Sequence, residues 1–173
     1  MFDRLSHYYF NKGLENAKAG MISAAVENLR KSLSYNISNT EAWKLIGLCF
    51  YRLGSLSTAE YCWTSCLRYG EADASVEEYI KNTRAVAVKV KPYMEELFQL
   101  SSKKKYKKAS SVFRKNIIPV LNSQADVFNY LGILYMLSGR KRKALKEWKK
   151  ALLIDCSGVS AVRYLANTGH IAK

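Results

Sequence analysis

The side chains best suited to metal chemistry are Cys62 and Cys66, which stand four residues apart. On a helix this spacing places both thiols one turn apart on the same side, where they could bind one metal ion. A packing role explains the pair better, because Cys66 stands where a small residue is wanted and Cys49 lies on an apolar face. The four cysteines at positions 49, 62, 66 and 156 do not resemble a disulfide framework, because a chain of 173 residues does not need covalent cross-links. We therefore expect no metal site and no cofactor.

The two histidines are the other candidates for chemistry. His7 and His170 lie near the ends of the chain, and neither forms a recognisable pair with a cysteine or a carboxylate. No glycine-rich phosphate-binding loop occurs, and isolated serines fall in helical segments. Because no set of residues fulfils the geometric roles of a catalytic site, we predict that the protein is not an enzyme.

Basic side chains dominate the charge, and they are unevenly distributed. The formal net charge is +14, with +1 in residues 1–87 and +13 in residues 88–173. Two clusters account for much of this excess: Lys103, Lys104, Lys105, Lys107 and Lys108, and Arg140, Lys141, Arg142 and Lys143. Such clusters attract anionic partners, so the elements that position them decide whether they act together.

Those elements repeat along the chain. Four pairs of identical residues are separated by 34 positions: Gly13 and Gly47, Gly20 and Gly54, Ala25 and Ala59, and Tyr35 and Tyr69. A period of this length indicates stacked supersecondary units, each of which buries its apolar face against its neighbours. A further copy begins near residue 125, with these matches: Gly47 with Gly132, Gly54 with Gly139, Ala59 with Ala144, Trp63 with Trp148, and Leu67 with Leu152.

Each unit is predicted to be a helical hairpin. Its first apolar run follows the helical positions i, i+3, i+4 and i+7 in two units: Trp43, Ile46, Gly47 and Phe50, and Phe128, Leu131, Gly132 and Tyr135. Small residues such as Gly47 and Ala59 would let two helices approach closely. Gly54 and Gly139 would end the first helix of their units, because glycine adopts a left-handed conformation at little cost. Trp63 and its equivalents would fill the gap between neighbouring hairpins.

This pattern resembles the tetratricopeptide repeat (TPR) family. The resemblance rests on the aromatic-x-x-apolar-Gly-x-x-aromatic run, the turn glycine, and the alanine and large apolar residue of the second helix. The first unit is a weaker copy, because Lys12 and Asn16 occupy places that the family makes apolar. The resemblance implies an all-α fold, a right-handed solenoid of helix-turn-helix hairpins with a C-terminal capping helix.

We expect a single solenoid over residues 1–173, with repeats at about 6–39, 40–73, 90–124 and 125–158. The third repeat is degenerate: Leu97 replaces the small residue and Lys104 replaces the turn glycine. The interval from Ala109 to Ala144 is 35 positions, so one residue is inserted. The capping helix is predicted at 159–168, packed through Val159, Val162 and Leu165.

An extra helix is expected at residues 74–89, which fit no repeat. Ser75 and Glu78 resemble a capping box at its start. Pro92 removes a backbone hydrogen-bond donor, yet the helical spacing of apolar residues continues past it. Either one long helix is kinked there or two helices meet, and we favour a break or kink near 90–92. The extra helix would be a spacer that shields the second repeat, or a lip that shapes or occupies a groove.

In the TPR family the first helices of the repeats line the concave groove. Their exposed faces here are mostly apolar, which suits a peptide or helix with apolar anchors, or else a neighbouring helix of a further domain that buries them. The residues predicted to line this groove are Phe10, Leu14, Lys44, Leu48, Tyr51, Met94, Phe98, Asn129, Ile133 and Met136. The carboxylate clamp of co-chaperones is not expected, because Phe10 and Leu14 occupy the corresponding places in the first repeat.

Both basic clusters fall in the turn between the two helices of a repeat. Equivalent turns of stacked repeats align, so we expect nine residues to form one basic rim: Lys103, Lys104, Lys105, Lys107, Lys108, Arg140, Lys141, Arg142 and Lys143. Two explanations stay open here. The rim could steer an acidic partner, or the lysines could simply keep exposed turns soluble.

The sequence therefore predicts a non-catalytic scaffold that binds a protein or peptide, acidic or apolar and helical, in an apolar groove beside a basic rim. The alternative is an adaptor whose basic rim binds an anionic membrane surface or nucleic acid. Nucleic acid is less favoured, because Tyr106 is the only aromatic residue within the clusters and falls on the packed side of its helix. Lacking a secretory signal and a membrane-length apolar run, the chain is expected to be cytoplasmic.

Overall fold

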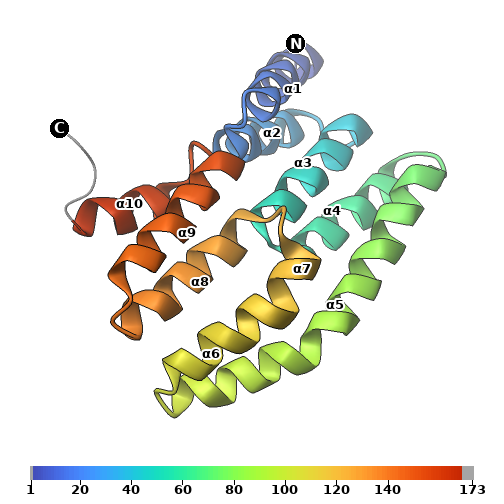
Figure 1. The fold of residues 1–173 in the computed structure, drawn as a ribbon. Helices are drawn as coiled ribbons and strands as arrows, with labels where there is room; N and C mark the ends of the chain where they lie inside the picture. Colours follow the sequence, from blue (N-terminus) through green and yellow to red (C-terminus); the bar gives the residue numbers. More distant parts are fainter. Residues whose placement is uncertain (1, 169–173) are drawn as a thin grey trace. The chain divides into compact units, whose positions relative to one another are not determined.

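The computed structural model describes residues 2–168, and in this part of the chain the regular elements are all helices (Figure 1). The all-α class of helix-turn-helix hairpins is thus confirmed. The chain divides into two compact units, Met1–Ala85 and Val86–Lys173. His170 lies outside the described residues.

The first unit contains two hairpins and the start of a fifth helix. Helices α1 (Phe2–Lys18) and α2 (Ile22–Tyr35) form one hairpin, and α3 (Thr40–Leu53) and α4 (Leu56–Tyr69) form the other. Their interior is apolar, because the residues at helical spacing point inward: Ile22, Val26, Leu29, Ile46 and Cys49 are all buried. The end of α4 and the start of α5 (Ala74–Ser102) share a second cluster, which includes Trp63, Val76 and Ile80.

The second hairpin shows why a glycine stands in the middle of α3. A Cβ at Gly47 would overlap the indole of Trp63, so only glycine lets the ring lie flat against the helix backbone. The indole Nε1 donates a hydrogen bond of 3.2 Å to the carbonyl of Lys44. On its other side the ring packs on Tyr79 of α5, with centroids 5.2 Å apart. Trp63 therefore closes its own hairpin and joins it to the next helix.

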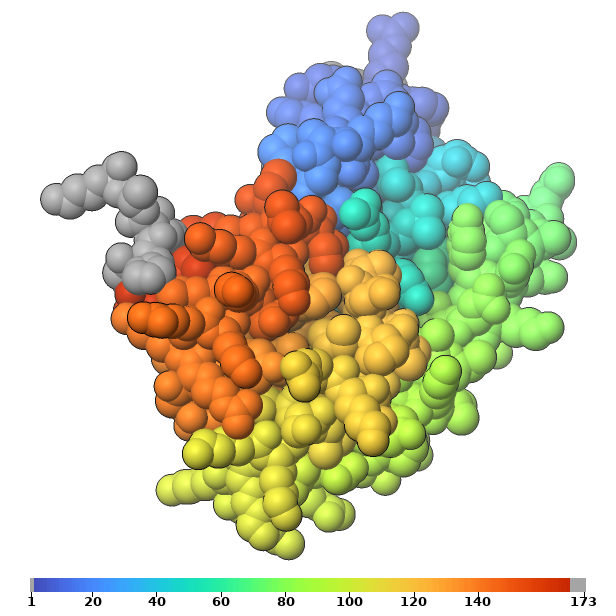
Figure 2. Space-filling model, viewed as in Figure 1, coloured from blue at the N-terminus to red at the C-terminus, as the bar shows by residue number. Residues whose placement is uncertain are grey.

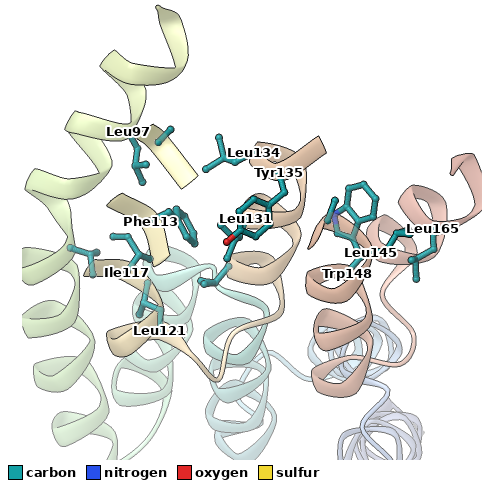
Figure 3. Packing of buried hydrophobic residues seen from close by; sticks show 14 residues of the cluster. Leu97, Phe113, Ile117, Leu121, Leu131, Leu134, Tyr135, Leu145, Trp148 and Leu165 are labelled. Carbon is teal, nitrogen blue, oxygen red and sulfur yellow. The ribbon is translucent and has the colours of Figure 1, made fainter. Parts of the chain in front are cut away.

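The second unit continues from α5 through α6 (Tyr106–Val112), a π-helical turn η1 (Phe113–Ile117) and α7 (Ile118–Leu121). The hairpin of α8 (Ala125–Leu137) and α9 (Lys141–Ile154) follows, and α10 (Val159–Asn167) packs on α9. One core joins these elements (Figure 3) and includes Leu97, Phe113, Ile117, Leu131, Tyr135, Trp148 and Leu165.

The α8–α9 hairpin repeats the glycine and tryptophan arrangement of the α3–α4 hairpin. A Cβ at Gly132 would overlap the indole of Trp148, whose Nε1 donates a hydrogen bond of 3.2 Å to the carbonyl of Asn129. The other side of the ring packs on Tyr164 of α10, with centroids 5.2 Å apart. Helix α10 thus contacts the tryptophan of the preceding hairpin as α5 does through Tyr79.

The capping helix is present, but its packed face differs from the prediction. Val159 is 65% exposed and Val162 is 41% exposed, whereas Ala161 and Leu165 are buried. This helix of nine residues has two apolar faces, one with Val159 and Val162 and one with Ala161 and Leu165, and either could pack against α9. Because Tyr164 contacts Trp148, the face with Ala161 and Leu165 packs inward, and Val159 and Val162 point toward solvent.

All four hairpin turns have the same backbone geometry. One residue just after the first helix has a positive φ: 75° at Gly20, 107° at Gly54, 79° at Gly139 and 56° at Lys104. At each turn the amide of the next residue donates a hydrogen bond to the carbonyl five positions earlier, as Lys105 does to the carbonyl of Leu100 over 2.8 Å. Lys104 therefore takes the place of the turn glycine, as the register predicts, in a conformation that strains a residue with a Cβ.

The residue inserted in the third repeat is accommodated in η1. A π-helical turn holds one more residue than the α-helical turn it replaces, so it absorbs an insertion without breaking the helix. Phe113 and Ile117, at its two ends, both remain buried in the core. The apolar residues that follow the insertion therefore still face the core.

Residues 74–89 are not a separate helix but the first part of α5, which continues through Pro92 to Ser102. Of the two arrangements considered at Pro92, the structure has one long helix. Its start is not the predicted Ser75–Glu78 capping box. Instead, the carboxylate of Asp73 accepts hydrogen bonds from the amide and hydroxyl of Ser75 and from the amide of Val76.

Candidate interaction surfaces

Helix α5 exposes large apolar side chains on a face that adjoins its buried one. Leu97 is 1% exposed and packs in the core, whereas Phe98 is 76% exposed and Met94 is 46% exposed. A shallow hollow on this face is lined by Lys91, Met94, Glu95, Phe98 and Gln99, all from α5. We call these five residues the α5 face. Because α5 is the first helix of the third hairpin, this surface is where the TPR resemblance predicts a groove wall.

The other residues predicted for the groove are less available. In the first unit, Phe10 packs against the α1–α3 core, Leu48 and Tyr51 pack beside Trp63, and Leu14 is half-buried. In the second unit Ile133 and Met136 are half-buried against the core around Leu131.

Asn129 and Lys44 have structural partners. Asn129 is 8% exposed, and its Nδ2 donates to Asp126, so it does not line an open surface. It is buried because α9 approaches closely enough for Trp148 to reach its carbonyl. Lys44 Nζ lies 2.8 Å from Asp73 Oδ2. The hydrogen bond to Asp73 raises the pKa of Lys44, while the hydrogen bonds from Lys44 and then Ser75 lower the pKa of Asp73 well below its usual range.

The two basic clusters lie at the same end of the helices of the second unit. The first cluster spans the α5–α6 turn and the start of α6, and the second runs from Arg140, in the α8–α9 turn, into the start of α9 (Figure 1). A hollow of about 510 Å³ lies between the first cluster and the end of α8, and it is lined by Lys104, Lys105, Tyr106, Lys107, Lys108, Leu137 and Ser138. We call these seven residues the turn hollow. In Figure 2 the yellow surface of the first turn adjoins the orange surface of the second.

The rim residues carry unneutralised charge. The ion pairs found within residues 2–168 join Lys44 to Asp73, Arg84 to Glu60 and Lys150 to Glu147, and none includes a rim residue. Arg140 and Lys143 each lie 5.9 Å from the centre of the Tyr135 ring, which holds them against α8. The remaining seven rim residues are exposed to solvent.

Neither the cysteines nor the acidic residues form a metal site in the part of the chain described. No group of three or more His, Cys, Asp or Glu side chains lies close enough there to hold an ion. Cys62 and Cys66 are both buried. Burial raises the pKa of the Cys62 thiol to about 11, and burial also raises that of Cys66, so both thiols stay protonated and unreactive at neutral pH. None of the helices in residues 2–168 is both long and apolar enough to cross a membrane.

Solved structures share this architecture. The chain is similar to the TPR domain of P58(IPK) with a TM-score of 0.53 and 15% identity, over 95% of this chain and 47% of that chain. It is also similar to MamA (TM-score 0.44, 17% identity, 98% of this chain and 97% of that chain). A third is YrrB, described as a TPR protein with an unusual peptide-binding site (TM-score 0.43, 18% identity, 91% and 90% covered). No protein-family model and no curated protein matches the sequence.

The chain therefore has the tetratricopeptide repeat fold. Its hairpins, turn residues and glycine–tryptophan contacts agree with the repeat pattern in the sequence. At these identities the comparison establishes the fold and leaves the ligand open.

The roles of two residues, Leu137 and Asp73, were not predicted from the sequence. Leu137 is 54% exposed and lies in the turn hollow beside the lysines. The available signal was an apolar residue at the end of a first helix, directly before a basic turn. Asp73 fixes the start of α5 through its hydrogen bonds, and an acidic residue just before a helix start was its signal.

Proposed function

We propose that this chain is a non-catalytic, cytoplasmic scaffold that binds a peptide or helix of another protein through apolar side chains of its first helices. The observation that carries the proposal is the α5 face, on which Phe98 and Met94 are exposed beside charged and polar neighbours. Exposed large apolar side chains grouped on one face are a common mark of a protein-interaction site.

The chemistry of the α5 face suits an apolar anchor. Phe98 offers a large, rigid surface, while the flexible thioether of Met94 can adapt to ligands of different shape. Full burial of a phenylalanine side chain contributes about 1.5–3 kcal/mol, which corresponds to a loss of affinity of roughly 10- to 100-fold when the ring is removed. Lys91 and Glu95 would add polar contacts at the margin of the same hollow.

An alternative function is favoured by the charge of the basic rim. Nine basic residues without an ion pair among the described residues could bind an anionic membrane surface or nucleic acid directly. The two functions make opposite predictions. If the α5 face holds the partner, replacing Lys103, Lys104, Lys105, Lys107 and Lys108 by glutamate mainly slows association. If the rim holds it, the same change abolishes binding, while Phe98→Ala has little effect.

A capture experiment with matched variants tests the proposal. The immobilised chain is exposed to a lysate of its source at low and high salt, and bound proteins are quantified by mass spectrometry. Phe98→Ser should remove at least one protein that the unmodified chain retains at high salt. Val88→Ser is the control, because Val88 is 74% exposed on the same helix but does not line the α5 face. Equal retention by all three chains would refute the proposal.

A further inference from the structure

We propose that the turn hollow is a second binding site, which takes an acidic peptide segment carrying one apolar side chain. The inference rests on the proposed function in one respect, since it assumes that the ligand belongs to a protein partner. The site is separate from the α5 face: no residue lines both hollows.

The geometry of the hollow combines one apolar contact with several cations. Leu137 ends α8 and is 54% exposed, so its side chain is open to a ligand. Tyr106 begins α6 and packs partly against the core, which holds its ring in place. Four lysines of the α5–α6 turn and the start of α6 border these two side chains: Lys104, Lys105, Lys107 and Lys108.

The electrostatics of this region select an anionic ligand. Residues 97–125 contain no aspartate or glutamate, and the same is true of residues 127–146. The lysines at the hollow have no ion-pair partner among the described residues. A carboxylate placed between them would gain attraction from several charges, with little desolvation cost because the lysines stay exposed.

The combination of an apolar side chain with several cations favours a peptide over the other anionic partners. Lipid headgroups and a duplex backbone are bound mainly through cations, whereas the exposed Leu137 adds an apolar contact beside the lysines of the hollow. An aromatic platform for stacking bases is also missing at the hollow, since its single aromatic residue, Tyr106, packs partly against the core. A short segment with carboxylates on both sides of an apolar residue meets both features of the hollow.

Fluorescence anisotropy with two labelled peptides tests this inference on the full chain. The first probe is Glu-Asp-Leu-Asp-Glu and the second is Glu-Asp-Gly-Asp-Glu. The leucine probe should bind about tenfold more tightly, as expected for burial of most of one leucine side chain. Leu137→Ser should remove this difference while leaving the binding of the glycine probe unchanged. Equal binding of the two probes by the unmodified chain would overturn the proposal.

Charge-matched double variants separate the hollow from the net charge. Lys105→Glu with Lys108→Glu should weaken the leucine probe at least about tenfold, through loss of two attractions and gain of two repulsions. Lys89→Glu with Lys149→Glu changes the net charge equally, but neither residue lines the hollow, so binding should change less than about twofold. Equal losses in both variants would show non-specific attraction and refute the site.

The remaining outcomes are also decisive. Tighter binding to phosphatidylserine vesicles or to duplex DNA than to the leucine probe, lost in the Lys105 and Lys108 double variant, would overturn the peptide assignment. Phe98→Ser should leave binding of the leucine probe intact, because Phe98 lies outside the hollow. If the leucine probe does not bind but Phe98→Ser loses a captured protein, the turn hollow alone is refuted. If the leucine probe binds as expected but Phe98→Ser loses no captured protein, the α5 face alone is refuted.

Discussion

Lys104 is the residue whose conformation is most clearly set by the repeat rather than by its own preference. Its φ of 56° is left-handed, whereas glycine occupies the same place in the other three turns. A residue with a Cβ pays about 1–2 kcal/mol in this conformation. Glycine avoids that cost but loses about 0.4–1 kcal/mol more conformational entropy on folding. We therefore expect Lys104→Gly to stabilise the second unit by about 0.5–1 kcal/mol.

Urea unfolding followed by circular dichroism measures this effect. With an m-value of about 2 kcal/mol/M, the midpoint should rise by about 0.3–0.5 M. Lys104→Ala is the matched control, because it removes the same charge but keeps the Cβ, so it separates backbone strain from repulsion among the lysines. Gly139→Ala is the converse change. A Cβ there would meet nothing within 4 Å, so its expected cost of about 1 kcal/mol comes from the backbone alone. The reasoning is refuted if Lys104→Gly and Lys104→Ala have the same midpoint.

Three further outcomes are expected. Gly132→Ala should destabilise the second unit by about 1–3 kcal/mol in urea unfolding, because the new methyl group overlaps the indole of Trp148. An unchanged or raised stability would contradict this packing. Of the four cysteines only Cys156 is exposed, so a thiol reagent should label one cysteine in the native protein and all four in urea, and native labelling should disappear in Cys156→Ser. The hydrogen bonds from Lys44 and Ser75 lower the pKa of Asp73, so its contribution to stability is present above the unfolded-state pKa of 3.8 and is lost as the pH falls below that value. Asp73→Asn should therefore reduce the loss of stability that the unmodified chain shows on acidification. An unchanged loss of stability at low pH would exclude this role.

Much of the fold was predictable because its determinants are local and periodic. The repeat interval located the hairpins, and the same register identified Lys104 as the replacement for a turn glycine. The 35-residue interval between Ala109 and Ala144 predicted an inserted residue, which η1 accommodates. These features depend on backbone conformation and helical phase, both of which leave marks in a single sequence.

The features that were not predicted depend on contacts between elements. Asn129 is polar and falls on a first helix, yet the approach of Trp148 buries it. Val159 and Val162 are more apolar than Ala161, but the contact between Tyr164 and Trp148 decides which face of α10 packs. Likewise, the hollow beside Leu137 exists only because the α5–α6 turn lies next to the end of α8. Helical periodicity alone contains no information about these neighbours.

The most direct test of the proposed scaffold is the amount of partner protein retained at high salt by the unmodified chain, by Phe98→Ser and by Val88→Ser. Binding through the α5 face predicts that Phe98→Ser loses at least nine-tenths of a retained protein, in line with the roughly tenfold minimum effect of removing the ring, while Val88→Ser retains it. Retention that is equal in Phe98→Ser and the unmodified chain, or that is lost equally in both variants, would contradict the account.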